Sequence, residues 1–300
     1  MKLICLIPAL FLVVGCDQLA TKKGDLLNVA FACPGEIKFA DHSWLVPFDR
    51  DTIEKNLAKK IKLNIPLIVH CLVPLCDNTF QGIIPTTPSL GDGFSITSNL
   101  YWATRNGMKR YYANHSDWKE IAIQFQPTDT ILERVVFKRK FENGANVILI
   151  CDAYRGDQME NCLVDYFDYL ADKKEDSIFF NNSYLKVGSE ADMIVFNGHN
   201  GLMDVQIDPV YATKKREKDA VVIACSSRWN YTEYITYTNS YPLVTTTSSL
   251  YPGASILNAI IEEWAFLKDP GTIRSAAGSA YHELKNCGAE SAADLFYTGW

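Results

Sequence analysis

Four short stretches of the chain are almost continuously apolar. They are residues 66–75, 146–151, 193–196 and 220–224. A strand with one face in solvent alternates apolar and polar side chains, whereas a strand that is covered on both faces is apolar throughout. The pattern therefore predicts four buried strands in the middle of a largely parallel sheet.

The segments between these runs predict the elements that connect and border the sheet. Residues 99–112 and 158–170 mix apolar and polar positions without a proline, which is typical of crossover helices between parallel strands. Residues 118–125 and 133–141 alternate and are expected to be strands. Residues 143–144 are Asn-Gly, which predicts a hairpin turn after the second of them.

Helical spacing dominates the C-terminal third. Apolar residues recur every three or four positions in 255–267 and 272–285, and Thr272 is a candidate N-cap of the second helix. No repeat, low-complexity run or long linker divides the chain. The expected fold is a single α/β domain over residues 28–300, with a mostly parallel central sheet flanked by helices and a helical C-terminal third.

The N-terminus carries a different kind of signal. Lys2 precedes an apolar stretch over residues 3–14, and Cys16 directly follows a small residue. This arrangement resembles a bacterial lipoprotein signal, which implies removal of residues 1–15 and attachment of a lipid to Cys16. Residues 16–27 would then be a tether, and the domain would be exported and anchored to the cell membrane. An ordinary secretory signal is the alternative, and the stretch is too short to span a bilayer in either case.

The composition is that of an ordinary globular chain, with 48% hydrophobic and 21% charged residues. A formal charge of −6 disfavours a nucleic-acid partner. Of nine cysteines, Cys5 lies in the signal and Cys16 would carry the lipid, which leaves an odd number, so at least one thiol is not paired within the chain. No Cys-x-x-Cys pair occurs, which disfavours structural zinc, and neither a metal nor a cofactor is expected.

Polar and reactive residues follow each of the four apolar runs. In open parallel sheets, ligands bind in the crevice outside the carboxyl ends of the strands, so these residues are expected to converge on one site. They are Cys76, Asp77 and Asn78 after the first run, Cys151 and Asp152 at the end of the second, Asn197, Gly198, His199, Asn200 and Gly201 after the third, and Cys225 and Ser226 after the fourth.

His199 and Cys225 are the most informative pair in this set. A thiolate is a strong nucleophile, and an imidazole within hydrogen-bond reach can take its proton or protonate a leaving group. Gly198 and Gly201 flank the histidine and would let backbone N–H groups approach a developing oxyanion. The residues that could orient groups or bind substrate around the pair are Asp77, Asn78, Asp152, Asn200 and Ser226.

Residues 193–199 form an apolar strand that leads to a histidine, and residues 220–225 form one that ends in Ala-Cys. This pattern resembles the caspase-like, or clan CD, cysteine peptidases, a group that includes legumains and gingipains. The resemblance implies a three-layer sandwich with Cys225 as nucleophile and His199 as base. It also implies an oxyanion hole from the backbone N–H of Cys225 and of a residue after His199, and a peptide or amide substrate.

A wider resemblance, over most of residues 66–300, is to a set of bacterial proteins of unassigned function. It supports a full-length single domain and implies no activity. The matching segments are residues 75–78, 81–83, 99–102, 198–204, 224–227 and 297–300.

Other interpretations of the same residues stay open. Asp77 and Asp152 could orient the imidazole, bind a substrate cation or hold a metal in a hydrolase, but aspartates at strand ends also commonly cap helices. His70 and Cys71 lie inside an apolar run and are expected in the core. The main alternative to an enzyme is a non-catalytic envelope protein that binds a peptide or glycan on the same fold.

Two further segments could line the site. Aromatic residues crowd positions 229–241 and would suit a groove for a peptide or sugar, although a core helix or strand would use them equally well. Residues 77–93 form a long loop rich in glycine and proline, which is a candidate wall of the site.

Overall fold

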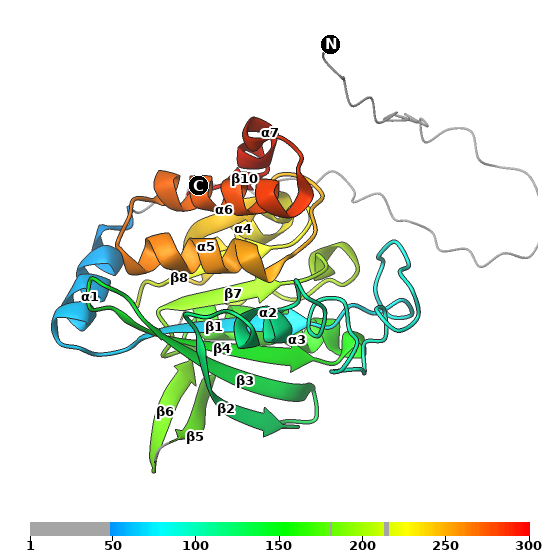
Figure 1. The fold of residues 1–300 in the computed structure, drawn as a ribbon, viewed down its shortest axis with the longest axis horizontal. Coiled ribbons are helices and arrows are strands. Elements are labelled where there is room, and N and C mark those ends of the chain that lie inside the picture. Colours follow the sequence, from blue (N-terminus) through cyan, green and yellow to red (C-terminus); the bar gives the residue numbers. More distant parts are fainter. Residues whose placement is uncertain (1–48, 181, 213–215) are drawn as a thin grey trace, which may run out of the picture. The chain divides into compact units, whose positions relative to one another are not determined.

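Parallel strands form the middle of one large sheet (Figure 1). The computed structural model describes residues 49–180, 182–212 and 216–300. In this part of the chain the sheet comprises β1 (Leu67–Pro74), β2 (Lys119–Phe125), β3 (Ile131–Lys140), β4 (Asn146–Tyr154), β7 (Met193–Asn197), β8 (Asp219–Ile223), β9 (Tyr241–Thr246) and β10 (Phe296–Tyr297). The order is β10-β9-β8-β7-β1-β4-β3-β2. Strands β9, β8, β7, β1 and β4 are parallel, while β10, β3 and β2 join antiparallel at the two sides.

The apolar runs explain why the central strands are central. Every residue of β1, β7 and β8 is buried, and so is every residue of β4 after Asn146. A strand without a polar face is stable only between two covering layers. The prediction of buried parallel strands is confirmed at all four runs.

The border strands also follow the predicted pattern. Strands β2 and β3 pair antiparallel, and β3 pairs antiparallel with β4. Gly144 has φ +90°, a backbone conformation that glycine adopts without strain, and this allows the chain to turn from Lys140 to Asn146. The expected Asn-Gly hairpin turn is confirmed.

Helices cover both faces of the sheet, and each face has its own hydrophobic core. We call these the α5 face and the α3 face. The α5 face packs against α1 (Asp51–Lys62), α2 (Met108–Ala113), α5 (Ala254–Ala265), α6 (Pro270–Lys285) and α7 (Ala289–Asp294), and the α3 face against the short η2 (Gly156–Gln158), α3 (Met159–Leu170) and α4 (Ser227–Tyr237). The expected α/β fold, with a mostly parallel sheet flanked by helices and a helical C-terminal portion, is confirmed.

The predicted helix over residues 99–112 is wrong in its first half. Residues 99–107 form turns, and only α2 is helical. The side chain of Asn99 explains the difference, because its Oδ1 accepts the backbone N–H of Cys76 at 3.2 Å and its Nδ2 donates to the Cys76 carbonyl at 2.8 Å. These bonds offer the backbone a conformation that competes with a helix.

The predicted N-cap of α6 is also wrong by a few residues. Asp269, rather than Thr272, is the N-cap, and its carboxylate accepts the backbone N–H of Thr272 at 3.0 Å. Pro270 occupies the first turn, where a missing N–H has no consequence.

A separate hairpin of β5 (Glu175–Phe180) and β6 (Ser183–Gly188) was not expected from the pattern. Most of its residues are exposed or half-buried, and Figure 1 shows it projecting from the sheet near β2. Polar contacts hold its base, where Gly188 N–H donates to Nδ1 of His70 at 3.1 Å and Arg134 donates to Asp176 at 2.6 Å. Partners so distant in the chain leave no local signal.

The N-terminal predictions lie outside the described residues. These are the signal over residues 1–15, the lipid-bearing Cys16, the tether over 16–27 and the first part of the domain. Within the described ranges, no helix is both long enough and apolar enough to cross a membrane.

Candidate functional site

Strands β7 and β8 bring the two main candidate residues to the same edge of the sheet. The strands are parallel neighbours, with Asn197 opposite Ile223, so their carboxyl ends lie side by side. His199 and Cys225 each follow their strand by two residues. In Figure 1 this edge is on the right, where the arrowheads of β1, β4 and β7 point.

The connections that leave this edge diverge. Helix α4, which follows β8, packs on the α3 face, whereas α5, which follows the neighbouring β9, packs on the α5 face. In open α/β sheets, the point where neighbouring connections leave toward opposite faces is where the ligand-binding crevice is expected. Cys225 borders this region, since its thiol donates to the carbonyl of Leu250 in the β9–α5 connection at 3.5 Å.

A carboxylate holds the imidazole of His199. Its Nε2 lies 2.8 Å from Oδ2 of Asp204, at the end of the short turn η3 (Gly201–Met203). The same Oδ2 accepts the backbone N–H of Gly82 at 2.8 Å. Burial alone would raise the pKa of the Asp204 carboxyl, but its hydrogen bonds with His199 and Gly82 outweigh burial, and the pKa is lowered. A charged Asp204 can therefore orient the ring.

The second ring nitrogen of His199 is not engaged. Nδ1 makes no hydrogen bond to any residue that the structure describes, and the side chain is 9% exposed. An imidazole with one nitrogen on a carboxylate and the other available is the arrangement that a general base requires.

Cys225 is half-buried and is not bonded to His199. Across the described ranges, no hydrogen bond joins Sγ to either ring nitrogen. Burial raises the pKa of the Tyr101 hydroxyl, and the negative charges of Cys76 and then of Cys225 raise it further. The base and the thiol thus follow the ends of neighbouring strands, and no hydrogen bond between described residues joins them.

Asn200 ties the β7 loop to the β8 loop. Its Nδ2 donates to the Cys225 carbonyl at 2.6 Å and to Oδ1 of Asn230 at 2.8 Å. A carbonyl can only accept, so this contact determines which way the amide points. Oδ1 of Asn200 is buried without a partner in the described chain, and so is Oδ1 of Asn197, whose Nδ2 donates to the Pro252 carbonyl at 3.1 Å. Both oxygens remain able to accept a hydrogen bond from a ligand or water.

The backbone N–H groups near the thiol differ in availability. Those of Asn200 and Cys225 have no acceptor among the described residues, so both remain available to an oxyanion. Those of Gly198 and Ser226 already donate to backbone carbonyls, at 3.2 Å and 3.0 Å, and cannot serve in the same way.

Gly198 and Gly201 have a packing role. A Cβ at Gly198 would lie 2.9 Å from the ring of Pro74, and one at Gly201 would lie 2.3 Å from the sulfur of Met159. The two glycines therefore let the loop that carries His199 lie close against β1 and α3.

Asp77 and Asn78 organise the long loop that follows β1. Asp77 accepts three backbone N–H groups within that loop, at 2.7–3.1 Å. Asn78 exchanges two hydrogen bonds with the backbone of Thr86. These side chains replace the regular secondary structure that the loop lacks, and neither one orients the imidazole of His199.

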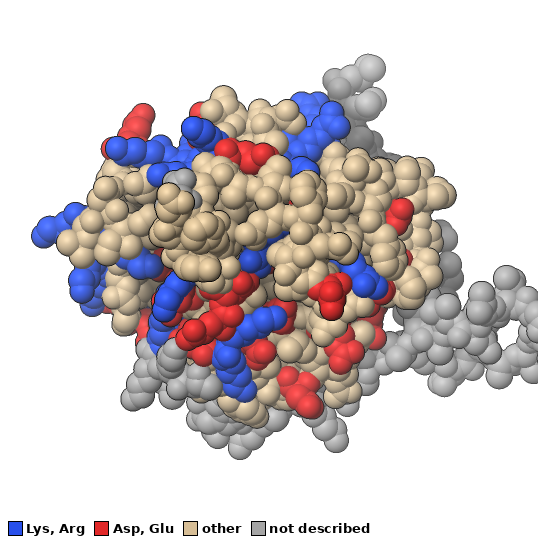
Figure 2. All heavy atoms as spheres, turned by 90° about the horizontal axis from the view of Figure 1, so that it is seen from below, with Lys and Arg blue, Asp and Glu red and all other residues tan. Residues whose placement is uncertain are grey.

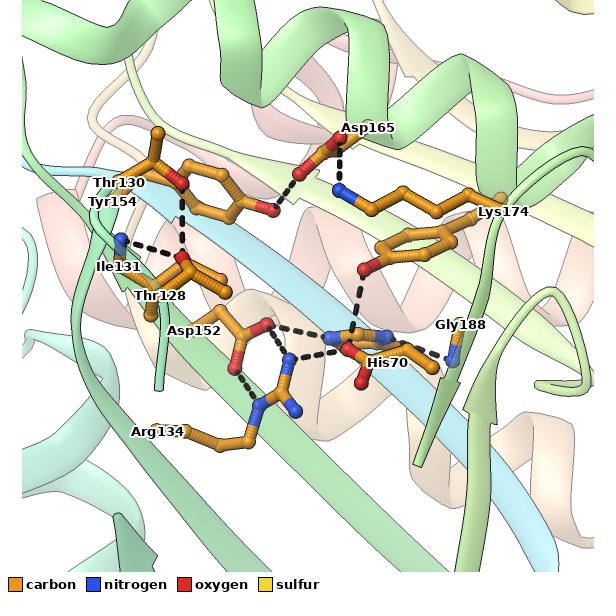
Figure 3. Close-up of polar contacts among 12 residues, drawn as sticks. His70, Thr128, Thr130, Ile131, Arg134, Asp152, Tyr154, Asp165, Lys174 and Gly188 are labelled. Carbon is orange, nitrogen blue, oxygen red and sulfur yellow. Dashed lines mark hydrogen bonds and ion pairs between the residues drawn. The ribbon is translucent and has the colours of Figure 1, made fainter. Parts of the chain in front are cut away.

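Asp152 is placed differently from the prediction. It lies inside β4, which continues to Tyr154, and not at a strand end. Its carboxylate binds Nε2 of His70 at 2.8 Å and the guanidinium of Arg134 at 2.6 and 2.7 Å (Figure 3). The expectation that Asp152 could orient His199 is therefore wrong, because both of its oxygens serve a buried network within the sheet.

The same edge exposes several large apolar side chains. Phe80 and Phe94 come from the loop after β1, Met203 from the turn after β7, and Trp229 from the first turn of α4. Exposed groups of this kind mark binding surfaces when they gather around one region. Tyr231, by contrast, is fully buried, so the aromatic segment 229–241 serves both surface and core.

Sequence reasoning did not identify Asp204 or Gly82 as part of the site. Asp204 lies five positions after His199, with Gly201 between them, a spacing that a tight turn can close. That spacing is the signal that could have found it. Gly82 contributes only its backbone N–H and leaves no signal in the sequence.

Charged side chains of both signs share the surface of the molecule. Figure 2 shows Lys and Arg interspersed with Asp and Glu, so the face in view has no broad basic patch. No cluster of three or more His, Cys, Asp or Glu in the described ranges could hold a metal ion.

Comparison with known proteins leaves the family of this chain open. No family model matches it, and neither a curated protein nor a solved structure is significantly similar.

Proposed function

We propose that the protein is a cysteine hydrolase with a caspase-like three-layer sandwich, acting by acyl transfer on a peptide or amide. Cys225 is the nucleophile, His199 the general base and Asp204 the carboxylate that orients the imidazole. One observation carries the proposal: His199 has one nitrogen on Asp204 and the other unengaged, at the sheet edge that also holds Cys225. The resemblance of residues 193–199 and 220–225 to clan CD peptidases supports it.

The reaction proceeds in two stages. The Cys225 thiol gives its proton to Nδ1 of His199, and the sulfur bonds to the substrate carbonyl carbon. The N–H groups of Cys225 and Asn200 stabilise the oxyanion that forms. When the C–N bond breaks, the amine takes the proton from His199 and leaves a thioester. Water then attacks the thioester and gives a proton to His199, which returns it to the departing sulfur.

The Cys225 side chain must rotate before the first stage. Its thiol faces the Leu250 carbonyl at 3.5 Å, so rotation toward His199 is required. Catalytic hydrogen bonds are often long before substrate binds and shorten in the complex. We expect substrate in the crevice to complete the pair.

The proposal includes a location. The pattern of residues 1–16 supports export and anchoring to the cell membrane through a lipid on Cys16. Incorporation of a labelled fatty acid into the wild-type chain, and its loss in Cys16→Ser, would support this. Equal labelling of both would refute it.

The enzymatic proposal is tested with a thiol-reactive probe that mimics an amide. We expect Cys225→Ala to abolish labelling and amide hydrolysis, and His199→Gln to slow both by roughly 10²–10⁴-fold. Cys287→Ala removes an exposed thiol elsewhere and serves as the matched control. Labelling of Cys225→Ala at the wild-type rate would overturn the proposal, provided that its thermal unfolding is unchanged.

A non-catalytic binding protein is the second candidate, and the exposed Phe80, Phe94, Met203 and Trp229 favour it. Such a protein would bind a peptide or glycan at the same edge without using the thiol. The dependence of Cys225 labelling on His199 separates the two functions. Equal rates in wild type and His199→Gln would indicate the binding protein.

A further inference from the structure

Two cysteines face each other across the centre of the sheet. Strands β1 and β4 pair in parallel with Cys71 directly opposite Cys151. Neighbouring strands lie about 4.8 Å apart, which falls within the range of about 4.4–6.8 Å that Cα atoms span in disulfides. Both side chains project to the α5 face and belong to its core. Their backbones therefore already stand at a spacing that a disulfide can bridge.

The surroundings of the pair are closed and apolar. Both cysteines are 0% exposed, and Val135 and Val195 occupy the adjoining positions on the flanking strands. Burial raises the pKa of the Cys151 thiol, and a hydrogen bond with Cys71 raises it further. The hydroxyl of Tyr112 is also buried here, without a hydrogen-bond partner in the described chain. Water has no access to this cluster.

We propose that Cys71 and Cys151 are a disulfide-forming site, cross-linked when the chain folds in an oxidising environment. The oxidant is a disulfide, either on an oxidising protein or in glutathione. One cysteine thiolate attacks that disulfide, forms a mixed disulfide and releases a thiol. The second cysteine then attacks the mixed disulfide, so the Sγ–Sγ bond forms and a second thiolate is released. The two protons lost by the cysteines pass to the two released sulfurs, and the oxidant ends as two thiols.

Burial determines when this reaction can take place. No oxidant can reach two thiols that are 0% exposed, so the bond must form before the helices close over the α5 face. Once formed, it is protected from reductants for the same reason. The bond would link β1 to β4 in the middle of the sheet. It does not involve Cys225, so this proposal can hold whether or not Cys225 is a nucleophile.

The test uses the full chain, folded in a buffer of oxidised and reduced glutathione. The protein is then denatured and alkylated with N-ethylmaleimide, with or without prior reduction, and its peptides are analysed by mass spectrometry. We expect Cys71 and Cys151 to be labelled only after reduction. Cys162 is also 0% exposed but lies in the core of the α3 face, and it should be labelled in both samples.

Variants and thermal unfolding add a second measurement. In Cys71→Ala, Cys151 should be labelled without reduction. Reductant during unfolding should lower the Tm of the oxidised wild type by roughly 5–10 °C and leave that of Cys71→Ala unchanged. If Cys71→Ala does not fold, the alkylation of Cys71 and Cys151 in the wild-type protein, with and without reduction, tests the proposal. Labelling of both cysteines without reduction, or a bond from either one to a different cysteine, would overturn the proposal.

Discussion

The described part of the chain contains two histidine–aspartate pairs with the same contact and different surroundings. His70 and Asp152 are joined through Nε2 and Oδ2 at 2.8 Å, and so are His199 and Asp204. The first pair lies inside the sheet and the second at its carboxyl edge. The contact is identical, so the other bonds of each ring decide what the pair can do.

The inner pair has no capacity left for chemistry. Gly188 N–H donates to Nδ1 of His70, so that nitrogen accepts and the ring proton lies on Nε2. Arg134 binds both oxygens of Asp152 (Figure 3). It also binds Asp176, at the base of the β5–β6 hairpin. Every strong donor and acceptor of the pair is used, which is what a buried polar network needs in order to stabilise a fold.

The outer pair is incomplete by comparison. Nδ1 of His199 has no partner in the described chain, and the side-chain oxygens of Asn197, at the end of β7, and Asn200 are buried without one. Polar groups that are unsatisfied inside a folded protein commonly await a ligand or water. Both histidines have a carboxylate partner, so the partner does not distinguish them. The second ring nitrogen does: it is hydrogen-bonded in the structural pair and unengaged in the candidate catalytic pair.

The largest effect is expected from Asp152→Asn. The substitution leaves the guanidinium of Arg134 buried without its full counter-charge, which should lower the free energy of unfolding by about 3–5 kcal/mol. Denaturant unfolding measures this. Asp204→Asn is the matched control, and it should cost less than about 1 kcal/mol because Asp204 is only half-buried. Equal destabilisation by the two variants would show that the inner pair does not contribute more to stability than the outer pair.

Asp204→Asn should instead affect reactivity. Without the carboxylate the ring of His199 loses its orientation, and we expect Cys225 labelling to slow by about 10²-fold, or about 2.7 kcal/mol. A structural role would not change the shape of the rate–pH profile, whereas a positioning role should shift it, and Asp204→Glu should restore part of the rate. An unchanged rate and profile in Asp204→Asn would remove Asp204 from the site.

Acid should weaken the inner pair. Burial by itself would raise the pKa of Asp152, but Arg134 and His70 outweigh it, and the folded-state pKa is lowered well below the unfolded value of about 3.9. The stabilisation is thus complete above about pH 4 and is lost as pH falls toward the folded-state pKa. Unfolding between pH 4 and 2 should show wild-type stability falling more steeply than that of Asp152→Asn, by up to about 1.4 kcal/mol per unit.

The smallest effect is expected from Gly82→Ala. An added Cβ would lie 2.5 Å from Oδ1 of Asp204 and would force that carboxylate to shift. We expect Cys225 labelling to slow by roughly 3- to 10-fold with little change in stability. Gly271→Ala, where the nearest atom would be 3.1 Å away, is the control and should react at the wild-type rate. Equal rates in the two variants would show that Gly82 does not position Asp204.

Local patterns were sufficient for much of the fold. The four apolar runs, the alternation in β2 and β3 and the helical spacing of α5 and α6 each depend on neighbours in the chain, so each could be predicted. The helix over residues 99–112 failed because Asn99 bonds the backbone of Cys76, a contact that no periodicity records. The β5–β6 hairpin escaped notice for the same reason.

The candidate site also has a part that the sequence predicts and a part that only the tertiary structure reveals. The sequence by itself determined that His199 and Cys225 follow adjacent apolar strands, because strand ends can be read from where hydrophobic runs stop. Only the tertiary structure decided that Asp204, and not Asp152, is the partner of His199. Both aspartates follow apolar residues and look alike in the chain. A carboxylate binds whichever donor the fold places within about 3 Å. Packing between strands far apart in sequence gives Asp152 to His70, whereas the short turn after His199 gives Asp204 to His199.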